Sequence, residues 1–217
     1  MKHSMKLPSS TKAVLFDMDG VIFNTEDLAH NVFSELATRF NKTFNEADHQ
    51  AIIGTAEQIW TKYFIDLWSL DVSQEGFSTL FWFELKKKIS HSATFMPFFE
   101  ECIAEVRKNG MKTALVTSTP LEDAKDTIAK FNLDHYFDQI ITGDLVQNGK
   151  PSPEPYLFAA KQLYLEPNQC AVIEDAVSGV ISGKAAGCYV VAVPTLHSKG
   201  LDYTKADKII ENLHELI

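Results

Sequence analysis

The 217-residue sequence contains little cysteine, with only Cys102, Cys170 and Cys188. Their number is odd, and no two of them form the Cys-x-x-Cys spacing of a zinc or redox site. Neither a disulfide framework nor a cysteine-based zinc site is therefore indicated. We expect reduced thiols in a cytoplasmic protein, because disulfides are rare in that compartment.

Basic residues are also scarce, with 20 Lys and Arg against 29 Asp and Glu and a net charge of −9. This balance argues against a broad surface for nucleic acid or an anionic membrane. No hydrophobic run approaches the length of a membrane span, and residues 1–10 are too polar for a signal peptide, so we expect a loose tail there. A small anionic substrate stays compatible with this charge, because it needs only a local cluster of donors.

A hydrophobic run that ends in two aspartates is the most informative feature that is present. Residues 13–16 read Ala-Val-Leu-Phe, which favours a buried strand, and Asp17, Asp19 and Gly20 follow at once. Carboxylates at the edge of a core cost free energy unless a cation holds them there. Asp and Gly are also common in ordinary turns. We favour a functional interpretation, because α/β sheets place their chemistry at the ends of their strands.

Helical periodicity dominates the first half of the chain, and helices alternate with strands in the second. The predicted helices of the first block are residues 26–40, 46–53, 55–68 and 74–91. Further along we predict helices at 98–109, 120–131, 153–163 and 178–186, and strands at 111–117, 139–142, 170–173, 189–193 and 208–210. Residues 119–122, Thr-Pro-Leu-Glu, are typical of a capping box at the start of a helix.

Repeated strand–helix units predict an α/β fold, a doubly wound, Rossmann-like parallel sheet with helices on both faces. The first helical block interrupts this pattern directly after the first strand. We therefore predict a core made of residues 1–23 and 94–217, with an inserted small α-helical cap at residues 24–93.

Polar groups follow the predicted strands at four places, which a doubly wound sheet brings to one crevice. They are Asp17 with Asp19, Thr117 with Ser118, Lys150, and Glu174 with Asp175. Carboxylate oxygens suit Mg²⁺, and a lysine with backbone amides suits a phosphate group. Taken singly, Thr117 is a helix-cap residue and Lys150 a surface lysine, but the four together indicate phosphoryl transfer.

These motifs resemble those of the haloacid dehalogenase superfamily, in its phosphatase and phosphomutase branch. The resemblance rests on Asp17-Met-Asp19-Gly-Val, Val-Thr117-Ser118, Gly-Lys150-Pro-Ser-Pro-Glu and Ile-Glu174-Asp175, in this order between residues 13 and 187. The helical insertion resembles that family's small cap. The subgroup that the chain resembles is beta-phosphoglucomutase with its sugar-phosphate phosphatase relatives.

The resemblance implies a role for each motif. Asp17 is expected to attack phosphorus and form an aspartyl-phosphate, while Asp19 protonates the leaving oxygen and later activates water. The implied Mg²⁺ ligands are Asp17, the Asp19 backbone carbonyl and Asp175, with Glu174 bound directly or one layer behind.

Thr117, the Ser118 amide and Lys150 are expected to bind the phosphate oxygens. The implied partner is a small phosphorylated metabolite, and we expect a monomer.

The cap offers fewer candidates. Gly54 and Thr55, in a break between two predicted cap helices, are candidate substrate contacts. Lys86–Lys88 are also candidates, although we favour a solvated helix end for them. We expect His30, His49 and His91 to be surface or packing residues, because no pair of histidines has the spacing of a metal site.

One departure from the family pattern bears on activity. The position of a histidine that the mutase uses is Ala29 here, which favours plain hydrolysis over a phosphohexomutase. A dehalogenase would need neither Asp19 nor the Glu174-Asp175 pair. A receiver-like signalling domain also combines clustered acids, a Thr or Ser and a Lys, but such domains are about half this length and lack a helical insertion.

Overall fold

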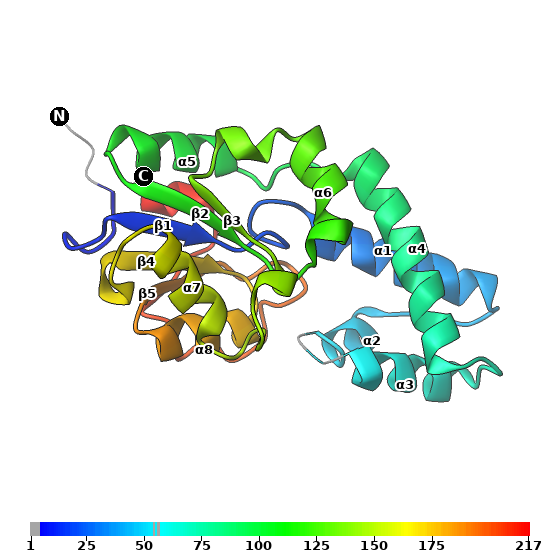
Figure 1. Cartoon of the computed structure of the whole chain (residues 1–217). Helices are drawn as coiled ribbons and strands as arrows, with labels where there is room; N and C mark the ends of the chain where they lie inside the picture. Colours follow the sequence, from blue (N-terminus) through cyan, green and yellow to red (C-terminus); the bar gives the residue numbers. More distant parts are fainter. Residues whose placement is uncertain (1–4, 54, 56) are drawn as a thin grey trace.

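The computed structural model describes residues 5–53, 55 and 57–217. Six parallel strands form one sheet in the order β3-β2-β1-β4-β5-β6 (Figure 1). They are β1 (Ala13–Phe16), β2 (Lys112–Val116), β3 (Gln139–Ile141), β4 (Cys170–Glu174), β5 (Tyr189–Ala192) and β6 (Lys208–Ile209). The strand order reverses beside β1, and in such sheets this switch point forms the ligand crevice.

Helices cover both faces of the sheet (Figure 1). One face carries α5 (Phe99–Lys108) and α6 (Leu121–Lys130), and the other carries α7 (Glu154–Gln162) and α8 (Val177–Ala186). Val14 and Phe16 of β1 pack toward the first pair, while Ala13 and Leu15 pack toward the second. Burial on both faces explains why this strand is hydrophobic without alternation. The predicted doubly wound parallel sheet is confirmed.

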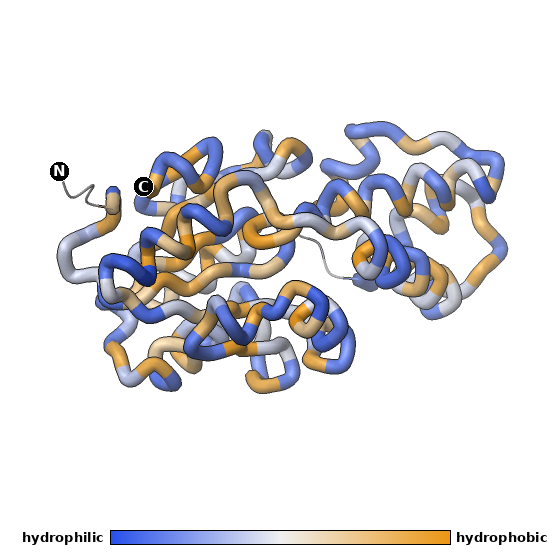
Figure 2. Tube along the Cα trace, turned by 90° about the horizontal axis from the view of Figure 1, so that it is seen from above, coloured by the Kyte–Doolittle hydropathy of each residue, from blue (hydrophilic) through white to orange (hydrophobic). Residues whose placement is uncertain are grey.

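Four further helices stand together at one end of the sheet (Figure 1). They are α1 (Thr25–Arg39), α2 (Glu46–Gln50), α3 (Glu57–Trp68) and α4 (Gln74–Ser92). They share a hydrophobic cluster in which the ring centroid of Phe33 lies 4.5 Å from Phe64 and 4.4 Å from Phe81. Figure 2 shows hydrophobic residues along the strands, with hydrophilic ones on the outward turns of the helices.

The two connections of this helical block lie side by side. The rings of Phe23 and Phe95 stack at 5.3 Å, and the backbone N–H of Thr94 donates to Asn24 Oδ1 at 2.9 Å. This pairing shows why a chain can leave the sheet after β1 and return without disturbing it. The exact domain boundaries, 23/24 and 93/94, stay a prediction.

The capping box predicted at Thr119 is wrong. Pro120 occupies the position before α6, and no side chain there caps the helix. The backbone N–H of Leu121 instead donates to Asp144 Oδ1 at 2.8 Å. The Thr119 hydroxyl donates to Asp19 Oδ2 at 3.3 Å, so a contact between distant segments outweighs the local cap. Within the part of the chain that the structure describes, no helix combines the length and hydrophobicity needed to cross a bilayer.

Candidate active site

Lys150 joins three strand ends at the centre of the site. Its Nζ donates to Asp17 Oδ1 at 2.5 Å, to Glu174 Oε1 at 2.7 Å and to the carbonyl oxygen of Val116 at 3.0 Å. Asp17 directly follows β1, Glu174 is the last residue of β4, and Val116 is the last residue of β2. Only 7% of the Lys150 side chain is exposed, so the surface position that this lysine would suggest on its own is excluded.

Asp175 lies against the loop that follows β1. A Cβ atom on Gly20 would meet Asp175 Oδ2 at 2.0 Å, and Gly20 has a positive φ of 73°. The residue therefore has to be glycine for two reasons, backbone conformation and the close approach of the carboxylate. Oxygens of Asp17, Glu174 and Asp175 all lie within 4.8 Å of one another.

Glu174 is fully buried, and its oxygens already have protein partners. Oε1 accepts from Lys150 and from the Tyr156 hydroxyl at 2.6 Å, and Oε2 accepts from the Ala176 backbone at 3.2 Å. A Cβ on Gly179 would lie 1.8 Å from Oε1, so α8 packs directly on this carboxylate. Glu174 is thus arranged to orient Lys150.

Asp19 stands apart from these carboxylates, half-buried beside α6. Its side chain accepts from Thr119, and it does not belong to the group of oxygens around Asp17 that the described residues form. Burial raises the pKa of Asp19, although the nearby Thr25 hydroxyl, the charge of Lys150 and the hydrogen bond from Thr119 oppose the shift. Its position and environment therefore differ from those of Asp17.

Thr117 and Ser118 follow β2, beside the end of β1. Thr117 is buried, and its Oγ1 accepts from the Thr119 backbone at 3.0 Å, which leaves its hydroxyl hydrogen free to donate elsewhere. Ser118 is exposed, and its backbone packs against Gly143, where a Cβ would meet the Ser118 carbonyl oxygen at 2.1 Å. The loop is thereby fixed with both residues at the carboxyl edge of the sheet.

The site carries an excess of buried negative charge. Burial raises the pKa of Asp17 and of Asp175, and neighbouring carboxylates raise both further. Burial alone would lower the pKa of Lys150, but Asp17 and Glu174 outweigh it and raise that pKa. One ammonium therefore faces several carboxylates, and a divalent cation would relieve their repulsion. The donors are all oxygens, which fits a hard cation such as Mg²⁺.

Sequence reasoning missed three residues of the site. Tyr156 donates a hydrogen bond to Glu174, and Thr119 donates one to Asp19. The third residue, Glu26 in the first turn of α1, is half-buried close to the site. Burial and then the charge of Asp19 raise the pKa of Glu26 to about 7. Glu26 is an acidic residue in the first turn of α1, a few residues after Asp19, which was a usable signal. Nothing in the local pattern marks Tyr156 or Thr119 as a site residue.

The candidate cap contacts lie differently. Gly54 falls outside the described residues. The Thr55 hydroxyl donates to the Ile52 carbonyl at 2.6 Å, which is a contact within the same loop. A role of Thr55 in substrate binding stays a prediction. Lys86 and Lys88 form ion pairs with Asp123 and Glu35, and a solvated helix end stays the favoured interpretation for Lys86–Lys88.

Comparison with known proteins identifies the family. Residues 14–193 match the haloacid dehalogenase-like hydrolase family. The chain belongs to this family. It is 35% identical over 176 residues to the phosphorylated carbohydrates phosphatase of Thermotoga maritima, covering 81% of this chain and 82% of the relative. It is 33% identical over 186 residues to hexitol phosphatase A of Escherichia coli, covering 84% and 82%.

A solved structure agrees with these relatives. A Thermotoga maritima protein assigned as a beta-phosphoglucomutase superposes with a TM-score of 0.78 at 30% identity, over 95% of this chain and 97% of that one. The predicted resemblance to the haloacid dehalogenase family is confirmed, and so is the predicted enzyme class, a phosphatase. A receiver-like signalling domain is set aside, because the match covers nearly all of a hydrolase fold.

Proposed function

We propose that this chain hydrolyses small phosphomonoesters, in particular sugar or polyol phosphates, through an aspartyl-phosphate on Asp17. The observation that supports this most is the convergence of Asp17, Lys150 and Asp175 at the carboxyl ends of β1 and β4. Two relatives above 30% identity are named phosphorylated carbohydrates phosphatase and hexitol phosphatase A, which favours this substrate class.

Asp17 and Asp19 divide the chemistry between them. A carboxylate oxygen of Asp17 attacks phosphorus, and the ester oxygen leaves with a proton from Asp19. Water then attacks the phosphorus of the acyl phosphate and gives its proton to Asp19, which releases phosphate and restores Asp17. The separation of Asp19 from the Asp17 cluster supports this division, because an acid–base residue has to reach the leaving oxygen.

The phosphate oxygens are bound by Thr117, the Ser118 amide and Lys150. Lys150 already lies at Asp17 in the structure, so its charge is in place where the phosphoryl group arrives. Glu174 and Tyr156 keep it there. Positioned charge of this kind needs no reorganisation during the reaction, which is why such contacts accelerate it.

The carboxylates of Asp17 and Asp175 and the backbone carbonyl of Asp19 would hold Mg²⁺, with Glu174 behind them. When bound, Mg²⁺ supplies positive charge that offsets the repulsion between the Asp17 carboxylate and an anionic phosphate. Helices α1–α4, the proposed cap, would exclude bulk water and contact the rest of the substrate.

A phosphohexomutase is the second candidate, since one structural relative is assigned to that class. Ala29 stands where the mutase has a histidine, which removes one group that could couple cap closure to Asp19. Without that coupling, water reaches the aspartyl-phosphate. Incubation with beta-glucose 1-phosphate, Mg²⁺ and a trace of the hexose bisphosphate separates the two, because efficient formation of glucose 6-phosphate with little free phosphate would establish the mutase.

The decisive experiment is a panel of phosphorylated metabolites with inorganic phosphate as the readout. We expect release from at least one sugar or polyol phosphate, loss of activity in excess chelator and recovery with Mg²⁺. Asp17→Asn provides the matched control, since it keeps the size of the side chain and removes the nucleophile. Full turnover in chelator, or in Asp17→Asn, would contradict the proposal.

A further inference from the structure

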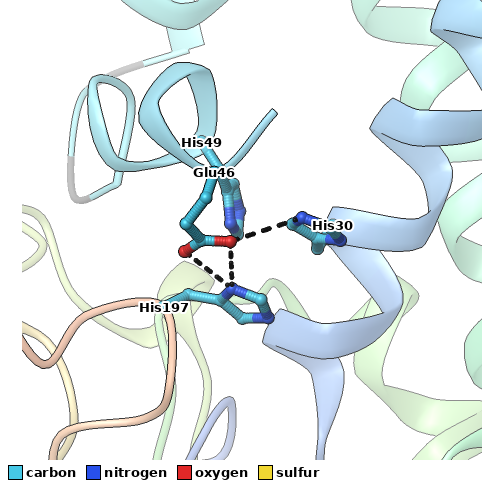
Figure 3. Close-up of side chains that lie close together, drawn as sticks. All are labelled: His30, Glu46, His49 and His197. Atoms are coloured by element: carbon cyan, nitrogen blue, oxygen red, sulfur yellow. Dashed lines mark hydrogen bonds and ion pairs between the residues drawn. The ribbon is translucent and has the colours of Figure 1, made fainter. Parts of the chain in front are cut away.

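A second cluster of metal-ligating side chains lies where the cap helices meet the core (Figure 3). His30 comes from α1, Glu46 and His49 come from α2, and His197 comes from the loop after β5. One ligand atom from each of the four lies within 4.8 Å of the others. The cluster shares no residue with the group around Asp17.

The distances within the cluster suit a tetrahedral metal ion. His197 Nδ1 lies 3.2 Å from Glu46 Oε1 and 3.3 Å from Oε2, and His30 Nε2 lies 3.5 Å from Glu46 Oε2. A tetrahedral zinc ion with bonds of about 2.0–2.1 Å places its ligand atoms about 3.3 Å apart. Glu46 therefore already lies at coordination-sphere spacing from both His197 and His30.

His49 points into the cluster without a partner of its own (Figure 3). Only 1% of the residue is exposed, and its Nδ1 is buried with no hydrogen bond. A buried polar atom without a partner is uncommon and costs free energy, so a ligand is expected there. Burial, and then the nearby His197 and His30, lower the pKa of His49 to about 4, which keeps the imidazole neutral.

Asp27 completes the surroundings of His197. Its Oδ1 lies 3.1 Å from His197 Nε2, the ring nitrogen that faces away from Glu46. If Nε2–H donates to Asp27, the Nδ1 lone pair faces the cluster. Histidines that bind metals commonly donate their second ring N–H to a carboxylate in this manner.

We propose that His30, Glu46, His49 and His197 form a binding site for a divalent transition metal ion, specifically Zn²⁺. Imidazole nitrogens suit Zn²⁺, whereas Mg²⁺ prefers the all-oxygen donors around Asp17. Glu46 is exposed and gives the ion a path from solvent. Because the ligands come from two cap helices and one core loop, a bound ion fastens the cap to the core.

The test is metal binding by the full-length protein, freed of metal with a chelator and kept in excess Mg²⁺. Co²⁺, which replaces Zn²⁺ and absorbs visible light strongly in tetrahedral nitrogen sites, reports occupancy directly. We expect one equivalent to give this spectrum and Zn²⁺ to displace it. His197→Ala and Glu46→Gln should lower Zn²⁺ affinity by more than about 100-fold, since even second-layer changes cost 10–100-fold. Asp27→Asn should cost about tenfold or more.

Two variants serve as matched controls. His91 is an exposed histidine outside the cluster, whose Nδ1 contacts the Lys87 carbonyl, so His91→Ala should bind Co²⁺ like the parent. Asp17→Asn should also keep the spectrum, because it alters only the other site. Glu46 is a surface residue, so Glu46→Gln keeps the test valid if His197→Ala fails to fold. If His197, Glu46 and Asp27 form only an ion-pair network, the protein will bind no Co²⁺. Absence of Co²⁺ binding would overturn the proposal, and so would an unchanged Co²⁺ spectrum in both His197→Ala and Glu46→Gln. Neither result depends on the outcome of the phosphatase assays.

Discussion

Replacement of Lys150 by methionine tests the electrostatic design of the site. The side chain keeps its length but loses the charge that lies 2.5 Å from Asp17 and 2.7 Å from Glu174. Removing one partner of a buried ion pair costs about 3–5 kcal/mol, because the remaining charge is left uncompensated. For a chain of this size, about 2–4 °C of melting temperature is lost per kcal/mol, so we expect a drop of about 6–20 °C.

Lys62→Met is the matched control for this change. Lys62 forms an ion pair with Asp66 at a similar distance, 2.8 Å, but 65% of its side chain is exposed. Exposed pairs contribute about 0–1 kcal/mol, so the melting temperature should fall by at most a few degrees. Both variants are compared by thermal unfolding in chelator, which keeps metal binding out of the measurement.

A double variant and a rate measurement complete the test. In Asp17→Asn/Lys150→Met both partners of the shorter ion pair are neutral, so the double variant should be more stable than the sum of the two single changes predicts. Turnover of p-nitrophenyl phosphate by Lys150→Met should fall on the order of a hundredfold, the usual effect of removing one donor to developing charge. Equal melting temperatures for Lys150→Met and Lys62→Met, with additive losses in the double variant, would refute the reasoning.

Three other predictions follow from single residues of the structure. Asp17→Asn should abolish turnover with an unchanged circular dichroism spectrum and a melting temperature at or above that of the parent, because carboxylate repulsion falls while Lys150 keeps Glu174 as its charged partner; a folded variant with ordinary phosphate release would place the nucleophile elsewhere. Gly20→Ala should lower both stability and activity, because its Cβ would meet Asp175 at a positive φ, whereas Gly110→Ala, also at positive φ but with open space around it, should lower stability alone. Burial raises the pKa of Cys102 to about 12, of Cys170 to about 11 and of Cys188 to about 12, so a thiol reagent near pH 8 should label none of them until denaturant is added, and rapid labelling of the native protein would contradict their burial.

Features that depend on local pattern could be predicted from the sequence. The hydrophobic run before Asp17 specified a strand buried on both faces, and strand–helix alternation then determined the parallel sheet. The topology brings Lys150 and Glu174 to the end of β1, so their convergence with Asp17 could be predicted from the positions of strand ends alone.

Contacts between side chains of distant segments could not be predicted. Thr119 has the spacing of a helix cap, yet its hydroxyl contacts Asp19 while Asp144 binds the Leu121 amide in its place. Tyr156 lies on a helix whose pattern shows only that one face is buried, so its bond to Glu174 has no local signal. The positions of the histidines in the sequence did not predict the proposed metal site. His197 comes from the core and His30 and His49 from the inserted helices, so only the folded chain brings them together.

The first turn of α1 connects the two polar clusters. Glu26 faces Asp19, whose charge contributes to its raised pKa, and the next residue, Asp27, pairs with His197. Consecutive residues of one helical turn are rigidly connected, so a displacement of this turn of α1 acts on both Glu26 and Asp27. Because α1 begins directly after the paired connections at Phe23 and Phe95, rotation of the helical block about that point would act on both clusters at once. Fixing the histidine cluster would thus also fix the carboxylate of Glu26 beside the acid–base residue of the proposed reaction.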